Sequence, residues 1–461
     1  MKTSNFSIAL LTLTLIGVPA VHSQTIATVS TSPSYQVVDH GADWRVLQKT
    51  TVENGITNIH SFNELATGMY YTNSQGQLTE SEESISILPT GGAEAVQGRH
   101  QVYFPSDIYN GVLEVVTPDG RQLKSRPLGI SYDDGSNTVF IATLTNSIGV
   151  LVSSNQIVYP NAFAADFKAD LVMKYRRGGF ECDLVFRTQP APSDAYGLDP
   201  ANSTLQLVTE FFDTQDPAET PCGDDEWFGL QDNTLKFGKM TMTHGKAFVV
   251  NSSNSQRPSA KRETSVFKSW LHLSGRTFLI EQVPLSYIAD DLGTLPLTAS
   301  VQKPEARSQK FASNDRQMPL AHKLVSDTNQ ILIASADLNK QPGVVLDYNE
   351  IDSGQTDYTF ASGQTYFIGG WVSVSGTTTF GGGAVLKFPE DGSGSLGCTT
   401  IVCSNSAYSP TVFTSEDDNS VGDTLPWSTG SPPGGKLLIV YLIMEIPMNW
   451  IIADFITPER R

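Results

Sequence analysis

The chain has 461 residues, of which 39% are hydrophobic and 17% are charged, as in folded globular proteins rather than disordered ones. This length exceeds what one ordinary hydrophobic core requires, so we expect two or three domains. Lys and Arg number 30 against 48 Asp and Glu, and the net charge is -18. Phosphate backbones repel such an acidic chain, and the sequence has neither a basic stripe for nucleic acid nor a polybasic patch for membranes.

The first residues have the pattern of a secretory signal peptide. Lys2 provides a positive start, residues 8–18 form an apolar run, and Val21 and Ser23 stand where a signal peptidase selects its site. The apolar run is shorter than the roughly 18 residues of a membrane span. We therefore predict a signal peptide over residues 1–23. We expect the protein to be secreted or displayed at the cell surface, with the periplasm as the alternative compartment.

Residues 24–300 are predicted to form a β-rich, sandwich-like module of short antiparallel strands. Apolar and polar residues alternate with a period of two, and turn signals interrupt them at 118–120 (Pro-Asp-Gly), 133–135 (Asp-Asp-Gly) and 178–179 (Gly-Gly). Glycine accepts the positive φ that such turns need, and proline presets one dihedral. The segment 284–296 predicts a short helix, because proline stands at its start and glycine near its end.

The composition changes twice in the remaining chain. Residues 301–330 are polar and mixed in charge, and we interpret them as a linker. Residues 331–427 carry a new apolar pattern, and residues 428–461 are a Gly/Pro linker followed by an atypical apolar tail. The uncharged apolar run at 437–444 is too short to predict a membrane anchor. A last strand with a capping helix, or a truncated or frame-shifted end, are the alternatives for the tail.

The new apolar region contains a recurring pattern, best seen in TTTFGGGAVLKF at residues 377–388. Aligning 377–380 with 398–401 gives an offset of 21 residues, and aligning 384–388 with 410–414 gives an offset of 26. Strands that recur at a period in the twenties are typical of a β-solenoid. In a solenoid each strand pairs in parallel with the strand one turn above, and glycine forms the corners. An ordinary antiparallel sheet is the alternative.

The same region resembles a known group of proteins. The stretch VSVSGTTTFGGGAVLKFPEDGSGSLGCTTIVCSNSAYSPTVFTSEDDNSVGD, residues 372–423, is similar to the opening coils of right-handed parallel β-helix proteins of the pectate-lyase-like superfamily. It is most similar to large uncharacterised secreted bacterial proteins in which a β-rich module precedes such a helix, and residues 68–104 and 157–198 resemble that module. The resemblance covers about residues 35–423.

The resemblance implies secretion and an all-β fold. It implies an antiparallel β-sandwich-like N-terminal module followed by the first coils of a right-handed parallel β-helix. It brings no catalytic residues, because no active-site motif is associated with this group. The tail departs from the pattern, since a β-helix would continue for several more coils.

Four cysteines are present, and export makes disulfides available to them. The local pairings are Cys182–Cys222 and Cys398–Cys403, which form one of three connectivities. Cys182 shares a predicted strand face with Phe180 and Leu184, so a buried thiol is the alternative there.

Two acidic segments are candidates for binding sites. Glu416, Asp417, Asp418 and Asp423 lie together on a predicted loop, where carboxylate oxygens suit calcium, the one cofactor we consider. A solvated acidic loop is the alternative. In the second segment, acidic residues adjoin an aromatic one, as on sugar-binding surfaces; its members are Asp224, Asp225, Glu226 and Trp227.

No catalytic residues are predicted. GxSxG and HExxH motifs are absent from the sequence, and GSGSLG at 392–397 precedes a strand-like CTTIVC rather than the helix that a nucleotide-binding loop requires. Fold analogy therefore predicts a non-catalytic protein that binds or adheres to polysaccharide or cell-surface components. The alternatives are a fragment of a β-helix polysaccharide lyase or glycoside hydrolase, and a truncated chain without function.

Overall fold

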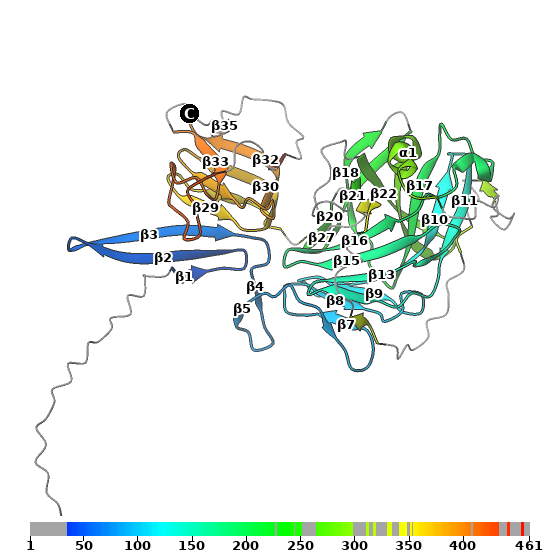
Figure 1. Ribbon diagram of the computed structural model, residues 1–461, viewed down its shortest axis with the longest axis horizontal. Helices are drawn as coiled ribbons and strands as arrows, with labels where there is room; N and C mark the ends of the chain where they lie inside the picture. Colours follow the sequence, from blue (N-terminus) through cyan, green and yellow to red (C-terminus); the bar gives the residue numbers. More distant parts are fainter. Residues whose placement is uncertain are drawn as a thin grey trace, which may run out of the picture.

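The structure is a computed structural model in which strands predominate (Figure 1). It describes residues 35–225, 228–243, 245–250, 264–297, 310–312, 317–319, 330–333, 341–347, 351–352, 354–406, 409–432, 440–442 and 453–455. Within them lie one α-helix, α1 (Leu285–Gly293), and one 3-10 turn (Ser193–Tyr196), so the helix predicted at 284–296 is confirmed. The predicted signal peptide and most of the predicted linker lie outside the described residues.

Two sets of mostly antiparallel strands enclose the larger core. The first set contains β6 (Ser86–Ile87), β7 (Ala93–Ala95), β8 (Gln101–Phe104), β9 (Leu113–Val116), β10 (Gln122–Asp133), β11 (Asn137–Leu144), β14 (Phe163–Ala164), β17 (Thr204–Phe212), β22 (Thr264–Leu273), β23 (Arg276–Pro284) and β24 (Lys310–Ala312). The second set contains β12 (Val150–Ser153), β13 (Gln156–Tyr159), β15 (Ala169–Tyr175), β16 (Gly179–Phe186), β18 (Ala218–Asp225), β19 (Leu230–Phe237), β20 (Met240–Met242), β21 (Gly245–Val250), β25 (Leu332–Ile333), β26 (Gly343–Asp347) and β27 (Ile351–Asp352).

The predicted turns join strands of this antiparallel module. Gly120 lies between β9 and β10 and has a φ of 86°, and Gly135 lies between β10 and β11 and has a φ of 80°. Alternating residues of the strands then point into one shared core, where Leu171, Leu207 and Leu346 are fully or almost fully buried. The period-two pattern therefore encodes the buried faces of these strands.

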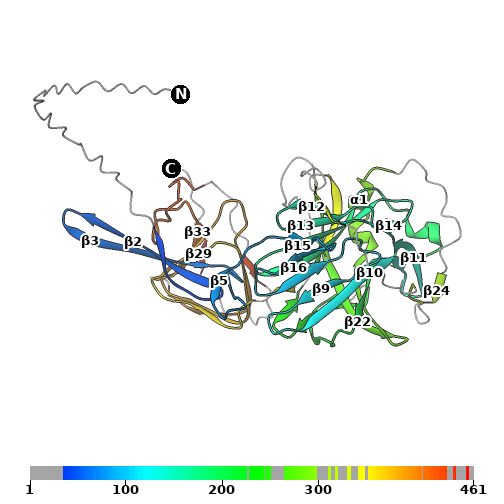
Figure 2. The same ribbon diagram turned by 90° about the horizontal axis from the view of Figure 1, so that it is seen from below.

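The remaining strands form a second lobe beside the antiparallel module (Figures 1 and 2). One of its sheets runs in the order β1 (Gln36–His40), β2 (Trp44–Glu53), β3 (Ile56–Leu65), β29 (Thr365–Ile368), β31 (Val385–Phe388), β33 (Thr411–Ser415), β35 (Ala453–Phe455). The other runs in the order β28 (Tyr358–Phe360), β30 (Trp371–Gly381), β32 (Ser395–Ser404), β34 (Val440–Leu442). A small hairpin, β4 (Tyr70–Thr72) with β5 (Leu78–Glu80), lies between the lobes.

From β28 onward the chain alternates between these two sheets, and each strand pairs in parallel with the strand two positions later. The first sheet begins with a segment from the other end of the chain. β3 pairs in antiparallel fashion with β2 but in parallel with β29, through residues 63–65. The ribbon of β2 and β3 thus occupies the first edge of the parallel stack.

Aromatic side chains stack inside this lobe. Phe360 on β28 lies directly opposite Phe380 on β30, with ring centroids 5.1 Å apart and ring planes 8° apart. Phe413 on β33 continues the contact, with its centroid 5.4 Å from that of Phe380. Similar residues in successive strands therefore fill one narrow core, as the recurring sequence pattern predicts.

The observed register differs from the predicted one. Thr377 pairs with Thr400 rather than with Cys398, and Val385 pairs with Val412 rather than with Thr411. The alignment by residue similarity was therefore wrong by two positions in one sheet and by one in the other. The register of paired strands is set by which side chains point into the core. A bulge between Val374 and Thr377 shifts the pairing of β30 with β32, so the positions that point inward change along the strand.

The division of the chain also differs from the predicted boundaries. Residues 35–65, assigned to the N-terminal module, pair with the parallel stack through β3. Strands β25 to β27, within the segment predicted to start the parallel region at 331, pair instead with strands of the antiparallel module. The sequence predicts neither of these two assignments, because the pairing of strands that are distant in the chain leaves no local pattern.

The glycine triplet at 381–383 forms a tight corner between layers of the stack. A Cβ added to Gly381 would lie 2.6 Å from the backbone nitrogen of Ser362 and 2.8 Å from the carbonyl oxygen of Phe360. A Cβ added to Gly382 would lie 2.8 Å from the carbonyl oxygen of Ser409. Backbone from the preceding and following layers thus fills the space that side chains would need.

We expect Gly381→Ala to lower the free energy of unfolding of the stack by about 1–3 kcal/mol, because backbone atoms of a neighbouring layer must move. Gly293→Ala is the control, since no atom lies within 4 Å of its added Cβ, and alanine favours the helix α1. Urea unfolding of both variants measures the difference. Equal midpoints for Gly381→Ala and the unsubstituted protein would contradict the close-packed corner.

Candidate functional site

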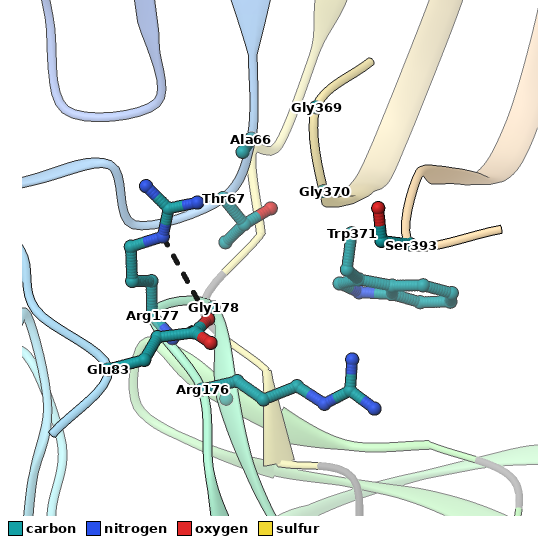
Figure 3. Close-up of a pocket in the computed structure, with 11 residues that line it drawn as sticks. Ala66, Thr67, Glu83, Arg176, Arg177, Gly178, Gly369, Gly370, Trp371 and Ser393 are labelled. Carbon is teal, nitrogen blue, oxygen red and sulfur yellow. Dashed lines mark hydrogen bonds and ion pairs between the residues drawn. The ribbon is translucent and has the colours of Figure 1, made fainter. Parts of the chain in front are cut away.

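A cleft of about 180 Å³ lies where the antiparallel module meets the parallel stack (Figure 3). Its walls come from five segments: the exit of β3, the loop before β6, the turn between β15 and β16, the start of β30, and the loop before β32. We call it the junction cleft, and its polar and aromatic members are Thr67, Glu83, Arg176, Arg177, Trp371 and Ser393.

The exit of β3 holds the two lobes together at the cleft. The backbone nitrogen of Thr67 donates to the carbonyl oxygen of Trp371 at 2.9 Å, and its hydroxyl accepts from the backbone nitrogen of Ser373 at 3.3 Å. On the other side, Gly68 has a φ of 73°, and an added Cβ would collide with the carbonyl oxygen of Arg177. This close approach explains the requirement for glycine at position 68.

The wall from the antiparallel module carries an excess of positive charge. The Nε atom of Arg176 lies 2.5 Å from Oε1 of Glu181, and the Nζ atom of Lys174 lies 3.9 Å from Oε2 of the same carboxylate. The backbone nitrogen of Arg177 donates to Glu83 at 2.9 Å, and its Nε lies 3.8 Å from the same oxygen. Three cations thus share two carboxylates, a local reversal of the negative charge of the whole chain.

Trp371 faces this wall from the parallel stack. Figure 3 shows the indole ring spread across the cleft, with the guanidinium group of Arg176 extended into the space beside it. Both side chains are partly exposed, and the residues Thr67 and Ser393 lie on the same side of the opening as the indole ring. An aromatic face next to a guanidinium group and hydroxyl groups is suited to a ligand with an apolar face and polar edges.

A buried histidine supports the floor of the cleft. His100 is 0% exposed, its Nε2 lies 3.1 Å from the carbonyl oxygen of Gly179, and its ring packs against Tyr175 with centroids 4.8 Å apart. Its Nδ1 has no hydrogen-bond partner among the described residues. The pKa of His100 is lowered from 6.5 to about 4, mainly by burial; the hydrogen bond to Gly179 opposes the change, and the charge of Arg99 adds to it.

The predicted calcium loop is held together by the chain itself. The ammonium group of Lys387, a buried residue of β31, donates to the carbonyl oxygens of Asp418 and Asp423 at 2.7 and 2.6 Å. The carboxylate of Asp418 accepts from the hydroxyls of Thr414 and Ser420 at 2.6 and 2.5 Å. The side chain of Lys387 thus lies among the residues that were predicted to bind a cation.

Two more carboxylates of the loop, those of Glu416 and Asp417, also accept hydrogen bonds. Glu416 accepts from the indole nitrogen of Trp427 at 2.7 Å and from the backbone of Glu390 at 3.0 Å, and Asp417 accepts from the backbone of Thr429. Burial raises the pKa of Asp418, but the hydrogen bonds from Ser420 and Thr414 and the charge of Lys387 lower it more, so it stays below its usual value.

No group of three or more His, Cys, Asp or Glu residues in the described part of the chain is arranged to hold a metal ion. The calcium site at Glu416, Asp417, Asp418 and Asp423 stays a prediction.

The second acidic segment lies only partly within the described residues. Asp224 and Asp225 end β18, and the carboxylate of Asp225 accepts from the hydroxyl of Tyr287 on α1 at 2.8 Å. Asp225 therefore attaches this loop to the helix. Glu226 and Trp227 lie outside the described residues, so the predicted sugar-binding surface stays a prediction.

The four cysteines are present as thiols, and neither predicted pairing is formed. Cys398 and Cys403 lie on the same strand, β32, where five residues of extended chain span on the order of 15 Å. A disulfide needs Cα atoms closer than about 7 Å. Cys182 is buried in the main core, as its apolar strand face indicated, and the thiol of Cys222 donates to Asp232 at 3.6 Å.

The junction cleft was not among the predicted sites. Its members are spread from Ala66 to Ser393, and each stands in a sequence that reads as an ordinary turn or strand end. The Gly-Gly pair at 178–179 was recognised as a turn, but its partner across the cleft, Trp371, follows another Gly-Gly pair almost two hundred residues later. Only the pairing of β3 with β29 brings them together.

Comparison with known proteins gave no matching family model, curated protein or solved structure. Within the described residues, no helix has the length and apolar character needed to cross a membrane. The apolar tail is described only at 440–442 and 453–455, where it adds β34 and β35 to the two sheets of the parallel stack.

The buried histidine makes a prediction for pH dependence. An unfolded histidine binds a proton below about pH 6.5, whereas folded His100 does so only near 4. Its contribution to stability is therefore complete above pH 6.5 and is lost as the pH falls toward 4, by about 3 kcal/mol. We expect His100→Gln, whose amide can still donate to Gly179, to flatten the dependence of unfolding free energy on pH in this range.

The matched control is His272→Gln, because the His272 side chain is 57% exposed. Urea unfolding at several pH values from 7 to 4 should give this variant the pH dependence of the unsubstituted protein, by the linkage between protonation and stability. If the unfolding free energy of His100→Gln depends on pH as steeply as that of His272→Gln, His100 is not the cause of the loss of stability at low pH.

Proposed function

We propose that the protein is a non-catalytic binding protein of the secreted or cell-surface adhesion type, and that its junction cleft binds polysaccharide. The observation that carries this proposal is the placement of Trp371 opposite Arg176 in a cleft formed by both lobes. Within the cleft the acidic Glu83 is engaged by Arg177, and no nucleophile stands beside a base among the described residues lining it. Binding is therefore the chemistry that the cleft supports best.

We further propose that the parallel stack is the beginning of a right-handed parallel β-helix. The alternation of β28 to β35 between two parallel sheets supports this architecture, because each turn of such a helix adds one strand to each sheet. A right-handed crossover is the general rule for parallel strands of one sheet. The ribbon of β2 and β3 would then cover the first coil.

Saccharide chemistry matches the cleft in two ways. The apolar face of a sugar ring packs on an indole, while guanidinium and hydroxyl groups form hydrogen bonds with its edges. The cleft volume of about 180 Å³ is smaller than the roughly 300 Å³ or more of sites that enclose a drug-sized ligand. We therefore expect one or two sugar units of a chain to enter, with the rest of the polysaccharide in solvent.

Trp371→Ala and Arg176→Gln should each weaken saccharide binding by at least tenfold, which corresponds to about 1.4 kcal/mol. Ligands would first be found by applying the mature protein to an array of neutral and acidic polysaccharides. Isothermal titration calorimetry, which does not depend on the tryptophan being replaced, would then measure affinity for the best ligand.

The matched controls change the same residue types elsewhere. Trp427→Ala removes a tryptophan that is 45% exposed and outside the cleft, and Arg121→Gln removes an arginine that pairs with Asp119. Both should bind as the unsubstituted protein does. The proposal fails if the array shows no binding, or if the control variants lose as much affinity as the cleft variants.

A further inference from the structure

Three charged side chains meet in the core of the antiparallel module, away from the junction cleft. They are Asp232 on β19, Lys268 on β22 and Glu281 on β23, and their exposed fractions are 2%, 0% and 0%. Charged residues are rarely buried to this degree unless they interact directly. The alternating pattern of buried residues in these strands does not require charged side chains, because apolar residues could occupy the same positions.

The geometry brings the amine and one carboxyl group into contact. The Nζ atom of Lys268 lies 2.9 Å from Oδ1 of Asp232, and the backbone nitrogen of Lys268 donates to the same oxygen at 3.0 Å. The thiol of Cys222 lies 3.6 Å from Oδ2. These contacts fix the orientation of the carboxyl group, so its carbon stands next to the nitrogen of the lysine.

The second carboxyl group lies on the neighbouring strand. Glu281 is directly opposite Lys268 in the antiparallel pair of β22 and β23. Opposite residues of such a pair project from the same face of the sheet, with Cβ atoms about 5 Å apart. The same three strands carry Leu235, Val266 and Leu279, which belong to the main core and are themselves 0% exposed.

The ammonium group of Lys268 and the carboxylate of Asp232 are buried together, so a proton can pass from one to the other along their hydrogen bond. If all three groups were ionised, two negative charges and one positive charge would be held without water, at a large cost in free energy. Transfer of one proton from the ammonium group to the adjacent carboxylate gives an amine beside a carboxylic acid. These two groups are the reactants of amide formation, held in contact at high effective concentration.

We propose that Lys268 and Asp232 join through an intramolecular isopeptide bond. The Nζ lone pair attacks Cγ of the Asp232 carboxylic acid, and the Glu281 carboxylate takes a proton from the nitrogen. Protonated Glu281 then donates that proton to the hydroxyl group on Cγ of Asp232, and this hydroxyl group leaves as water. One N–C bond forms, one C–O bond breaks, one water is released, and no oxidant or other reactant is needed.

The bond would tie the hairpin of β18 and β19 to the hairpin of β22 and β23 across 36 positions of sequence. A cross-link of this kind restricts the unfolded chain in the same way as a disulfide. The proposed amide requires no oxidising environment, and the surrounding apolar side chains exclude the water that would hydrolyse it.

Mass spectrometry of the denatured, purified protein tests this inference. The intact mass should be lower than the sequence mass by one water molecule. Tandem spectra of a tryptic digest should show the peptide that contains Asp232 joined to the one that contains Lys268, and trypsin should not cut after Lys268. A folded protein with the full sequence mass and separate peptides would overturn the proposal, whatever the variants do.

Two variants and one control test the assigned roles. Lys268→Met should have the full sequence mass, and Glu281→Gln should reach the linked mass at least tenfold more slowly, or not at all. Lys174→Met removes an ion-paired lysine from a solvent-accessible position and should still lose one water. Loss of water in Lys268→Met, or a normal rate in Glu281→Gln, would contradict the proposed chemistry.

Discussion

The parallel hydrogen bonding of β3 with β29 is the contact on which the rest of the structure depends. It brings a segment near residue 64 to the first edge of a stack formed more than three hundred residues later. Every later layer of that sheet pairs in turn with the layer before it, from β29 through β31 to β33. Because the chain runs from β3 through the hairpin of β4 and β5 into the antiparallel module, the same contact places both lobes side by side and forms the cleft between them.

Buried charges play different roles in the two lobes. In the parallel stack, the ammonium group of Lys387 is satisfied by two backbone carbonyl oxygens and holds an acidic loop against β31. In the antiparallel module, Lys268 meets a carboxyl group at 2.9 Å in a site closed to solvent. The first lysine is held by backbone carbonyl oxygens, whereas the second is held by a side-chain carboxyl group with which we propose that it forms an amide.

The features visible from sequence are those encoded locally. The period of two and the turns at Gly120 and Gly135 identify antiparallel strands, and the recurring Phe380 region indicates strands that pair in parallel. Register was misjudged because a bulge near Ser375 shifts the inward positions without changing residue type. The sequence gives no sign that the ammonium group of Lys387, thirty-one residues before Asp418, lies among the residues of the acidic loop. The junction cleft and the buried triad unite residues from distant strands, so only the fold reveals them.

Cross-linking across neighbouring parallel strands tests the central arrangement most directly. With the native cysteines replaced by alanine, Thr377→Cys with Thr400→Cys places two thiols on paired positions, whose strands are about 5 Å apart. A short bifunctional thiol reagent such as dibromobimane should join them efficiently. It should not join Thr377→Cys with Ser404→Cys, which lie about 13 Å farther along the strand. Equal or preferential cross-linking of the 377 and 404 pair would contradict the parallel register.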